Sequence, residues 1–569
     1  MTAASASTPP STGLVEDRPG KPFDVPGDAA VVIAGGGPVG LATAIELGTR
    51  GVDCLVLEPR TQVSSLRPRA KSSSVRTMEH FRRWGLADRL RAAAALPVDF
   101  SQQAVFCTSL LGHEITRVDD CFGLTPERRP EFAESAQQVA QPVVETVLRA
   151  AAAELPTVRL ALGWSLTDCT PSGPDGPVVV GARAADGRTT QVTARYLVGA
   201  DGPGSVTRSA VGVRLEGADD ARANRSIVFR CPGLAERVPH GPAVHYWVVN
   251  PRFSGVMGRM NLTDTWWLNV SVTALEDDGP LSAEELVRAY VGGPVDVEVL
   301  STDTWHARMQ LADSYRVGPV FLAGDAAHLN PPWGGHGYNT GVGDAVNLGW
   351  KLAAVLQGWA DPGLLDSYQA ERRAVAQETI GWTTSSMRAS VAMRPGPALE
   401  AHGPDGVRER AALAGTARAT MDGEFHSLGL VLGYAYTGSP VVEHGERDAG
   451  DPPPVVESLT TYRPSTTPGA RLPHAWLPDG TSLYDALRGG LTLVVYQTES
   501  GTDELLTAAD RAGIPLTVVR LDGVLSRPDD RTAAVLVRPD QHIAWRGLGK
   551  PLSAAEADAV LARITGRAG

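Results

Sequence analysis

The chain has 569 residues, of which 43% are hydrophobic and 20% are charged, and its formal net charge is −12. This length exceeds one ordinary domain, and the composition is typical of globular proteins. The negative charge argues against nucleic acid or an anionic membrane as a partner, and the apolar runs are too short to span a bilayer.

Residues 1–27 are rich in Ser, Thr, Pro and Gly and lack the basic and apolar regions of a signal peptide, so we expect a disordered N-terminal segment there. The five cysteines are scattered and show neither metal nor redox spacing. This pattern predicts reduced packing residues, no metal site and a cytoplasmic protein.

A glycine-rich segment follows the first predicted strand, over residues 29–34, and opens a predicted helix that ends at residue 48. Its spacing fits the G-x-G-x-x-G pattern, which allows a tight turn, close approach to a pyrophosphate and close helix–strand packing. The helix would direct its positive N-terminal end at the phosphates. The residues of this segment that we expect to contact a dinucleotide are Gly35, Gly37, Pro38, Val39 and Gly40.

An acidic residue ends the second predicted strand, over residues 52–57. Glu58 follows the glycines by about twenty residues, where a carboxylate accepts hydrogen bonds from ribose hydroxyls. Arg60 comes directly afterwards and would approach the adenosine. The two strands, the glycines and the acid together favour a dinucleotide site over a glycine-rich turn without a ligand.

The predicted elements then alternate between helices and strands. Residues 73–95 and 141–155 have helical periodicity, and residues 158–200 alternate like a small sheet that is interrupted by a turn at 171–177. Residues 225–275 hold aromatic strands suited to the roof of a pocket. A short strand at 320–322 and a helix at 341–357 follow.

The tail forms a unit of its own in the sequence pattern. Strands are predicted at 491–496, 516–521, 533–537 and 543–546, and helices at 502–512 and 553–564. This β-α-β-β-β-α order suits a thioredoxin-like domain. The tail contains no cysteine and therefore no CxxC, so it cannot carry out thiol redox chemistry, and packing or dimerisation is the preferred role.

Two more segments complete a pattern. Tyr196-Leu197-Val198-Gly199-Ala200-Asp201-Gly202 follows the small sheet, and Gly324-Asp325-Ala326-Ala327-His328 leads into Pro331-Pro332-Trp333-Gly334-Gly335-His336-Gly337-Tyr338-Asn339-Thr340-Gly341. In this order, the three segments resemble the G-x-G-x-x-G, DG and GD motifs of the group A flavoprotein aromatic hydroxylases, in the branch of phenol and polyketide hydroxylases. The resemblance extends over residues 28–569.

The resemblance implies a fold and an activity. The fold is α/β, with a Rossmann-like FAD-binding domain interleaved with a β-sheet substrate domain and followed by the thioredoxin-like domain. The activity is that of a monooxygenase that takes hydride from NADPH or NADH, forms a flavin C4a-hydroperoxide with O2, and hydroxylates a phenolic ring. A polyketide-like secondary metabolite is favoured over a simple phenol as the small-molecule aromatic substrate, and a homodimer is possible.

The domain division that we predict has five parts. Residues 28–210 form the first part of the FAD-binding domain with insertions of the substrate sheet, 211–314 the substrate-binding sheet, and 315–400 the second part of the FAD-binding domain. Residues 401–569 form a linker and the thioredoxin-like domain, and residues 1–27 precede them all.

The resemblance also assigns cofactor contacts. Asp325 would bind a ribityl hydroxyl, Asp201 would lie near the pyrophosphate with Arg208 supporting its turn, and the loop from Pro331 would pass the isoalloxazine. The helix predicted from Gly341 would add its positive end and favour the anionic reduced flavin. The further FAD contacts are Arg76, Gln141, Gly324, Pro332, Gly335, Gly337, Tyr338 and Asn339.

The catalytic and substrate residues follow from position. Lys71 occupies the place where phenol hydroxylases tend to have an acid, and a cation there would lower the pKa of a phenol. Trp333 and His336 lie in the segment 331–341, which the resemblance places beside the flavin and which we call the flavin-edge loop. By strand alternation, Tyr246 faces opposite to His245 and Trp247, so only one set can line the pocket. The substrate-binding candidates are Arg69, His245, Tyr246, Trp247, Arg259 and Trp267.

Two alternatives stay open from the sequence. The same flavin chemistry could oxygenate a ketone in a Baeyer–Villiger reaction, which gives an ester or lactone. A non-catalytic flavin-binding protein, with the tail as its interaction module, is the other. A flavin-dependent halogenase is less favoured because the chain has no W-x-W-x-I-P run.

Overall fold

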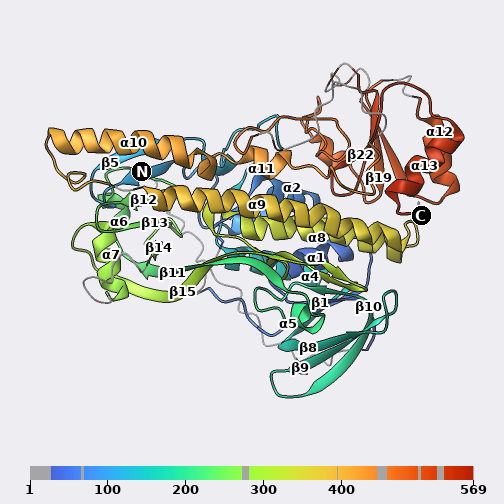
Figure 1. Cartoon of the computed structure of the whole chain (residues 1–569), viewed down its shortest axis with the longest axis horizontal. Helices are drawn as coiled ribbons and strands as arrows, with labels where there is room; N and C mark the ends of the chain where they lie inside the picture. Colours follow the sequence, from blue (N-terminus) through green and yellow to red (C-terminus); the bar gives the residue numbers. More distant parts are fainter. Residues whose placement is uncertain are drawn as a thin grey trace, which may run out of the picture.

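The computed structural model describes residues 27–65, 70–271, 281–393, 395–444, 456, 458–497, 501–521, 524, 529 and 531–567. Two eight-stranded sheets and one four-stranded sheet organise this part of the chain. The long helices α8 (His336–Leu356) and α9 (Ser367–Ala392) cross the middle of the molecule, between the mainly parallel sheet and the tail (Figure 1).

The first sheet is mainly parallel and has the strand order β16-β17-β10-β1-β2-β7, and β9 and β8 extend it from β10. Its strands are β1 (Ala29–Ala34), β2 (Cys54–Glu58), β7 (Val158–Leu162), β8 (Trp164–Pro171), β9 (Val178–Ala184), β10 (Thr189–Gly199), β16 (Arg316–Val317) and β17 (Val320–Leu322). The helices that accompany it are α1 (Pro38–Gly48), α2 (Val75–Arg83), α3 (Ala87–Ala93), α4 (Gln141–Glu154) and α5 (Val206–Ala210).

Burial on both faces explains why β1 is an uninterrupted apolar run. Val31 and Ile33 pack in a core cluster with α1, α4 and α8, whereas Val32 and Ala34 pack against the β8–β9 hairpin. Strands β2, β10 and β17 run parallel to the β1 direction. The carboxyl ends of these four strands therefore lie at the same end of the sheet. The three sequence motifs follow β1, β10 and β17 and meet there.

The second sheet has the order β18-β15-β11-β14-β13-β12-β4-β5. Its strands are β4 (Ala104–Cys107), β5 (Glu114–Val118), β11 (Leu215–Arg230), β12 (His245–Val249), β13 (Ser254–Arg259), β14 (Thr265–Ser271), β15 (Glu298–Ala312) and β18 (His328–Leu329). Helices α6 (Leu234–Arg237) and α7 (Ala283–Val291) cover one face, and the opposite face roofs the cavity described below. Two short strands, β3 (Ser72–Ser73) and β6 (Gln137–Gln138), pair with each other as a separate antiparallel ladder.

Two more helices, α10 (Pro404–Phe425) and α11 (Leu428–Gly433), lead to the tail, which lies beyond one end of α9 (Figure 1). The tail sheet has the order β20-β19-β21-β22. Its elements are β19 (Leu491–Val495), α12 (Asp503–Arg511), β20 (Leu516–Arg520), β21 (Ala534–Val537), β22 (Ile543–Gly547) and α13 (Ala554–Ile564). The predicted β-α-β-β-β-α order is thus confirmed.

Two predicted helix boundaries are wrong, and glycines explain both. The helix expected over residues 73–95 is two helices, because Gly85 has φ +72° and ends α2 with a left-handed residue. The helix expected from residue 341 begins at His336, because Gly335 has φ +66° and starts α8 within the motif itself. The residues of the flavin-edge loop after Gly335 are therefore already helical.

The structure also bears on the predictions about cysteines, metal sites and membrane spans. All five cysteines are free and buried, as expected of packing residues. Within the described ranges, no cluster of three or more metal-ligating side chains is found. A search of the same residues finds no helix with the length and apolarity to cross a bilayer. Residues 1–26, where we predict disorder, lie outside the described part.

Candidate active site

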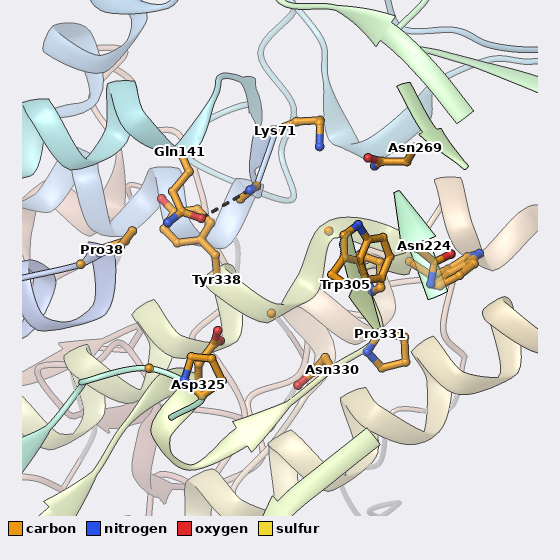
Figure 2. A pocket seen from close by; sticks show the side chains of 18 of the residues that line it. Pro38, Lys71, Gln141, Asn224, Asn269, Trp305, Asp325, Asn330, Pro331 and Tyr338 are labelled. Carbon is orange, nitrogen blue, oxygen red and sulfur yellow. Dashed lines mark hydrogen bonds between the residues drawn. The ribbon is translucent and has the colours of Figure 1, made fainter. Parts of the chain in front are cut away.

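A single cavity of about 930 Å³ connects the edge of the parallel sheet with the open face of the second sheet. The first motif contributes Gly35, Gly37, Pro38 and Val39 to its lining, and the aromatic strands contribute His245, Trp247 and Trp267. Figure 2 shows Pro38, Gln141 and Asp325 on one side of this space and Lys71, Asn269 and Trp305 on the other. The glycine-rich motif therefore lies at one end of the cavity and the aromatic strands at the other.

The turn between β1 and α1 suits a pyrophosphate. Gly35 has φ +100°, and a Cβ there would lie 2.3 Å from the carbonyl oxygen of Ala200. A Cβ on Gly40 would lie 1.9 Å from the carbonyl oxygen of Gly35, so Gly40 permits close packing of α1 rather than contact with a ligand. Gly37 is the N-cap residue of α1 and offers no side-chain cap, and a Cβ there would meet open space. The N–H groups of this helix end thus remain available to an anion.

Glu58 lies where a ribose would reach it. Its Oε2 accepts a hydrogen bond from the Gly36 N–H at 2.7 Å, and its Oε1 accepts from the backbone and Nε of Arg60 at 2.9 and 2.7 Å. These contacts fix the carboxylate at the cavity wall. Gln141 also lines the cavity, with its Nε2 donating to Glu145 at 2.8 Å.

The DG motif builds its own turn. Asp201 accepts hydrogen bonds from the Ser205 hydroxyl and from the N–H and hydroxyl of Thr207, and these contacts hold the start of α5. Arg208 donates to the carbonyl oxygens of Pro203 and Ala326, at 2.9 and 3.0 Å. The DG and GD motifs are thereby joined through Arg208. Asp201 and Asp325 both line the cavity.

A buried acid that the sequence reasoning missed holds the GD motif in place. Asp344, in α8, accepts from the Gly324 N–H at 3.0 Å, from Nε of Arg372 at 2.8 Å, and contacts Nε2 of His328 at 2.8 Å. Burial would raise the pKa of Asp344, but Arg372 and His328 lower it. In the sequence, Asp344 is recognisable as the one acid within residues 341–354, most of which are small or apolar.

The flavin-edge loop is anchored by helices α9 and α10 and by strand β3. Nε1 of Trp333 donates to the Ser390 hydroxyl at 2.9 Å, and the Gly334 N–H donates to Oε1 of Glu424 at 2.8 Å. The Tyr338 hydroxyl lies 3.1 Å from the Ser73 hydroxyl. Gly335 is the N-cap of α8 without a side-chain cap, so the first N–H groups of this helix are also free to face a ligand. The loop residues that line the cavity are Pro331, Pro332, Trp333, Gly334, Gly335, Gly337 and Tyr338.

Two loop candidates point elsewhere. Asn339 accepts from the Ser74 N–H at 2.9 Å and donates to the Gly335 carbonyl at 2.7 Å, so its amide holds the loop together from beneath. His336 is buried, and a Cβ on Gly334 would lie 2.4 Å from its ring. Burial lowers the pKa of His336 to about 4, so the ring is neutral. The predicted catalytic role of His336 is not supported, and the predicted contact of the backbone N–H groups near Asn339 with the flavin stays a prediction.

Lys71 reaches the aromatic end of the cavity. Its Nζ lies 4.5 Å from the centre of the Trp267 ring, and its accessible surface faces the cavity. Burial lowers the pKa of Lys71 to about 8. Burial and the charge of Lys71 lower the pKa of His245 to about 3, so this imidazole is neutral. At this end of the cavity, Lys71 therefore lies beside neutral aromatic side chains.

Strand alternation separates the aromatic candidates as predicted, and the structure shows which set lines the cavity. Tyr246 faces the other side of the sheet, where its hydroxyl donates to the Gly241 carbonyl at 2.5 Å. Arg259 donates to the carbonyls of Asn261 and Thr263 and closes the β13–β14 turn. Tyr246 and Arg259 are thus not cavity residues.

Arg76 is also misplaced by the sequence reasoning. Its guanidinium is buried and donates to Glu79, to the Gln541 side chain and to the Asp540 carbonyl, so it binds the tail instead of the flavin. The face of α2 that carries Arg76 is covered by Asp540 and Gln541 of the tail, which are more than 450 residues away in the chain. Arg69, the remaining substrate candidate, lies outside the described residues.

Several cavity residues had no motif to reveal them. Asn269 lies two residues after Trp267 on β14, and alternation from Trp267 would have found it. Its Oδ1 accepts from the Ser226 hydroxyl at 2.6 Å, and that hydroxyl accepts from Nε1 of Trp305 at 2.8 Å, which leaves the Asn269 amide N–H groups for the cavity. The other lining residues that the sequence did not indicate include Phe122, Asn224, Val249, Trp305, Ser390, Met393 and Glu424.

Comparison with known proteins agrees with this geometry. Residues 28–383 match the family model "FAD binding domain", and residues 465–568 match "Aromatic-ring hydroxylase, C-terminal". The chain is 32% identical to an FAD-dependent monooxygenase, apdD, of Emericella nidulans, over 99% of this chain and 94% of the relative. It is 33% identical to a putative polyketide hydroxylase of Streptomyces halstedii, over 94% and 96% of the two chains.

A solved structure has a similar fold. The structure of the rebeccamycin biosynthetic enzyme RebC with reduced flavin matches with a TM-score of 0.85 and 34% identity, over 96% of this chain and all of that chain. These relatives are monooxygenases and hydroxylases, so the Baeyer–Villiger alternative is not favoured. The chain belongs to the family of FAD-binding aromatic-ring hydroxylases and is an FAD-dependent monooxygenase.

Proposed function

We propose that the protein hydroxylates a phenolic ring of a polyketide-like secondary metabolite and uses NADPH or NADH as the reductant. The observation that carries the proposal is one continuous cavity with an uncapped helix end for a pyrophosphate and, at its far end, a cation among aromatic walls. The cavity of about 930 Å³ would hold both the cofactor and the substrate. Its aromatic end and the polyketide hydroxylase among the relatives support a multi-ring substrate over a simple phenol.

Lys71 has the chemistry to activate the substrate. A positive charge beside a phenol stabilises the phenolate, and the phenolate oxygen directs electron density to the ring carbon that is attacked. Charged Lys71 would supply this attraction, while the neutral His245 would not compete for the anion. Trp247 and Trp267 would hold the ring by its faces and exclude water.

FAD, when bound, supplies the activation of oxygen, so the chain's own task is to position the cofactor and the substrate. Glu58 and the N-terminal end of α1 would hold its nucleotide part, and Asp325 its ribityl chain. The N-terminal end of α8 would stabilise negative charge on its ring edge. Asp201 and Arg208 would maintain the turn beside the pyrophosphate.

The nicotinamide nucleotide needs no permanent domain in this proposal. The chain has no second G-x-G-x-x-G after a strand, which agrees with transient binding of NADPH or NADH. The buried, unpaired cysteines support a reducing compartment such as the cytoplasm, where both nucleotides occur. The experiment below measures whether NADPH or NADH is preferred.

The test is NADPH and NADH oxidation by the FAD-loaded protein against a panel of phenols, naphthols and polyketide-like hydroxyquinones, with peroxide and product mass followed together. We expect at least one compound to accelerate nucleotide oxidation and to gain one oxygen atom as a hydroxyl group. An ester or lactone product would instead restore the Baeyer–Villiger reaction. A panel without any accelerated oxidation would contradict hydroxylation of this substrate class.

A further inference from the structure

Glu424 is a buried acid at the cavity for which the motifs provide no role. It lies in the last turn of α10, it is 4% exposed, and it belongs to the cavity lining. Its Oε1 accepts the hydrogen bond from the Gly334 N–H in the flavin-edge loop. Its Oε2 is buried and has no hydrogen-bond partner among the residues that the structure describes.

The surroundings of Glu424 are apolar. Its neighbour Phe425 packs edge-on against Trp247 and Phe106, and these rings form one core cluster with Met393 and Trp333. Among the described side chains, no Arg, Lys or His acts on the charge of Glu424. Burial raises the pKa of Glu424 to about 8, and the Gly334 hydrogen bond only partly opposes this shift. The carboxyl group is therefore neutral at neutral pH.

A neutral carboxyl group is both a donor and an acceptor. Because Oε1 already accepts from Gly334, the proton belongs on Oε2, which has no acceptor in the described protein. A buried donor without an acceptor is unfavourable, and such a group in a cavity wall indicates that a ligand completes the hydrogen bond. The acceptor should be neutral, because Glu424 has no cation beside it to balance the charge of a carboxylate.

We propose that Glu424 is a specificity-determining residue that donates a hydrogen bond from Oε2 to a carbonyl oxygen of the aromatic substrate. This inference rests on the proposed function, since it assumes an aromatic substrate in the cavity. The substrate class is then a phenolic ring fused or conjugated to a carbonyl, as in an aryl ketone or a hydroxyquinone. Lys71 takes the phenol oxygen beside Trp267, and Glu424 takes the carbonyl oxygen beside Gly334.

The test compares two matched probes in the absence of NADPH. A hydroxytetralone, with its hydroxyl group remote from the carbonyl, and the corresponding hydroxytetralin share the same rings and differ in the carbonyl group. Their dissociation constants are measured from absorbance changes of the oxidised, FAD-loaded protein. We expect the wild type to bind the tetralone about tenfold more tightly, the difference that one hydrogen bond makes.

Two variants assign that difference to Glu424. Glu424→Gln keeps a donor and an acceptor of the same shape, and it should retain the preference to within about threefold. Glu424→Leu removes the donor, so its dissociation constant for the tetralone should rise about tenfold while that for the tetralin stays within about twofold. A wild-type preference in Glu424→Leu, no preference in the wild type, or no binding of either probe would overturn the inference.

A spectroscopic measurement on the wild type covers the case in which Glu424→Leu does not fold. The carbonyl stretch of the bound tetralone should lie at lower frequency than in an apolar solvent, because a donated hydrogen bond weakens the C=O bond, and an unshifted band would refute the contact. Neither readout needs turnover. Binding with the expected preference but without hydroxylation would refute the proposed function alone.

Discussion

The ionisation of Lys71 connects the cavity to pH. Burial lowers its pKa to about 8, so the ammonium group is charged below this pH and becomes neutral above it. Attraction of a phenolate is present on the acidic side and is lost as the pH rises through about 8. An opposite charge within about 4–6 Å moves a pKa by about 1–3 units, so the loss of this cation should lower kcat/KM by about tenfold or more.

We therefore expect Lys71→Met to lower kcat/KM below pH 8 and to remove the decline above it, with FAD still bound. The pH profile should be recorded with a naphthol that lacks a carbonyl, so that Glu424 makes no hydrogen bond to the substrate. Lys550→Met, at an exposed position in the tail, is the matched control. If the pH profile of kcat/KM for Lys71→Met is identical to that of the wild type, Lys71 does not take part in substrate activation.

Asp325 tests the cofactor end of the same cavity. The carboxylate lines the cavity directly after Gly324, whose N–H is fixed by Asp344. Loss of a hydrogen bond from a charged group costs about 1.5–3 kcal/mol, so Asp325→Ala should weaken FAD binding by roughly 10- to 100-fold. The ratio of flavin to protein absorbance after gel filtration measures this. Asp366→Ala, with its acid on the surface, should stay yellow, and an Asp325→Ala protein that is equally yellow would refute the contact.

At the scale of the elements, the sequence pattern predicted those helices and strands that are determined by residues close together in the chain. The first strand, its glycine turn and helix α1 follow from apolar periodicity and glycine spacing within twenty residues, and β1 and β17 have the predicted bounds. The start of α8 was missed because Gly334 and Gly335 are equally compatible with a loop and with a left-handed N-cap. The predicted domain boundaries stay a prediction. Strands β4 and β5 join the second sheet from within residues 28–210, where the prediction placed insertions of the substrate sheet.

The errors in the site arose where long-range packing decides. Alternation showed that His245 and Tyr246 face opposite sides, but only the position of α7 reveals which side is core. Arg76 was assigned to the flavin because nothing near it in the chain shows that the tail covers it. Glu424 was missed because its helix reaches the cavity only through tertiary contacts, whereas alternation from Trp267 could have found Asn269.

At the scale of the whole molecule, a buried cluster of charges joins the tail to the two long helices. Glu371 of α9 accepts from Nζ of Lys351 at 2.6 Å and from both terminal nitrogens of Arg538 in the tail, at 2.5 and 2.8 Å. Asp540 accepts from Arg538 and, at 3.0 Å, from Asn347 of α8. The same helices carry Asp344 and Arg372, which hold the GD motif, so the tail supports the cofactor site. Dimerisation through the tail stays a prediction.

The cluster also predicts how the protein responds to acid. Burial would raise the pKa of both acids, but Arg538 lowers it, together with Lys351 at Glu371, and the pKa of Asp540 falls to about 2. A depressed carboxyl pKa stabilises the fold above the unfolded value of about 4, and this contribution is lost as the pH falls toward the folded value. Stability should therefore decline between about pH 4 and pH 2.

Glu371→Gln is the variant that separates this cluster from ordinary surface pairs. It leaves Lys351 and Arg538 buried with too little negative charge, and removal of one partner from a buried ion pair costs about 3–5 kcal/mol. Thermal and urea unfolding should show this loss at pH 7 and a shallower decline in acid than in the wild type. Glu154→Gln removes an exposed partner of Arg89, whose solvent-screened pair contributes little to stability, and controls for the charge change. Equal unfolding of Glu371→Gln and Glu154→Gln would show that hydrophobic packing, and not the charge cluster, holds the tail in place.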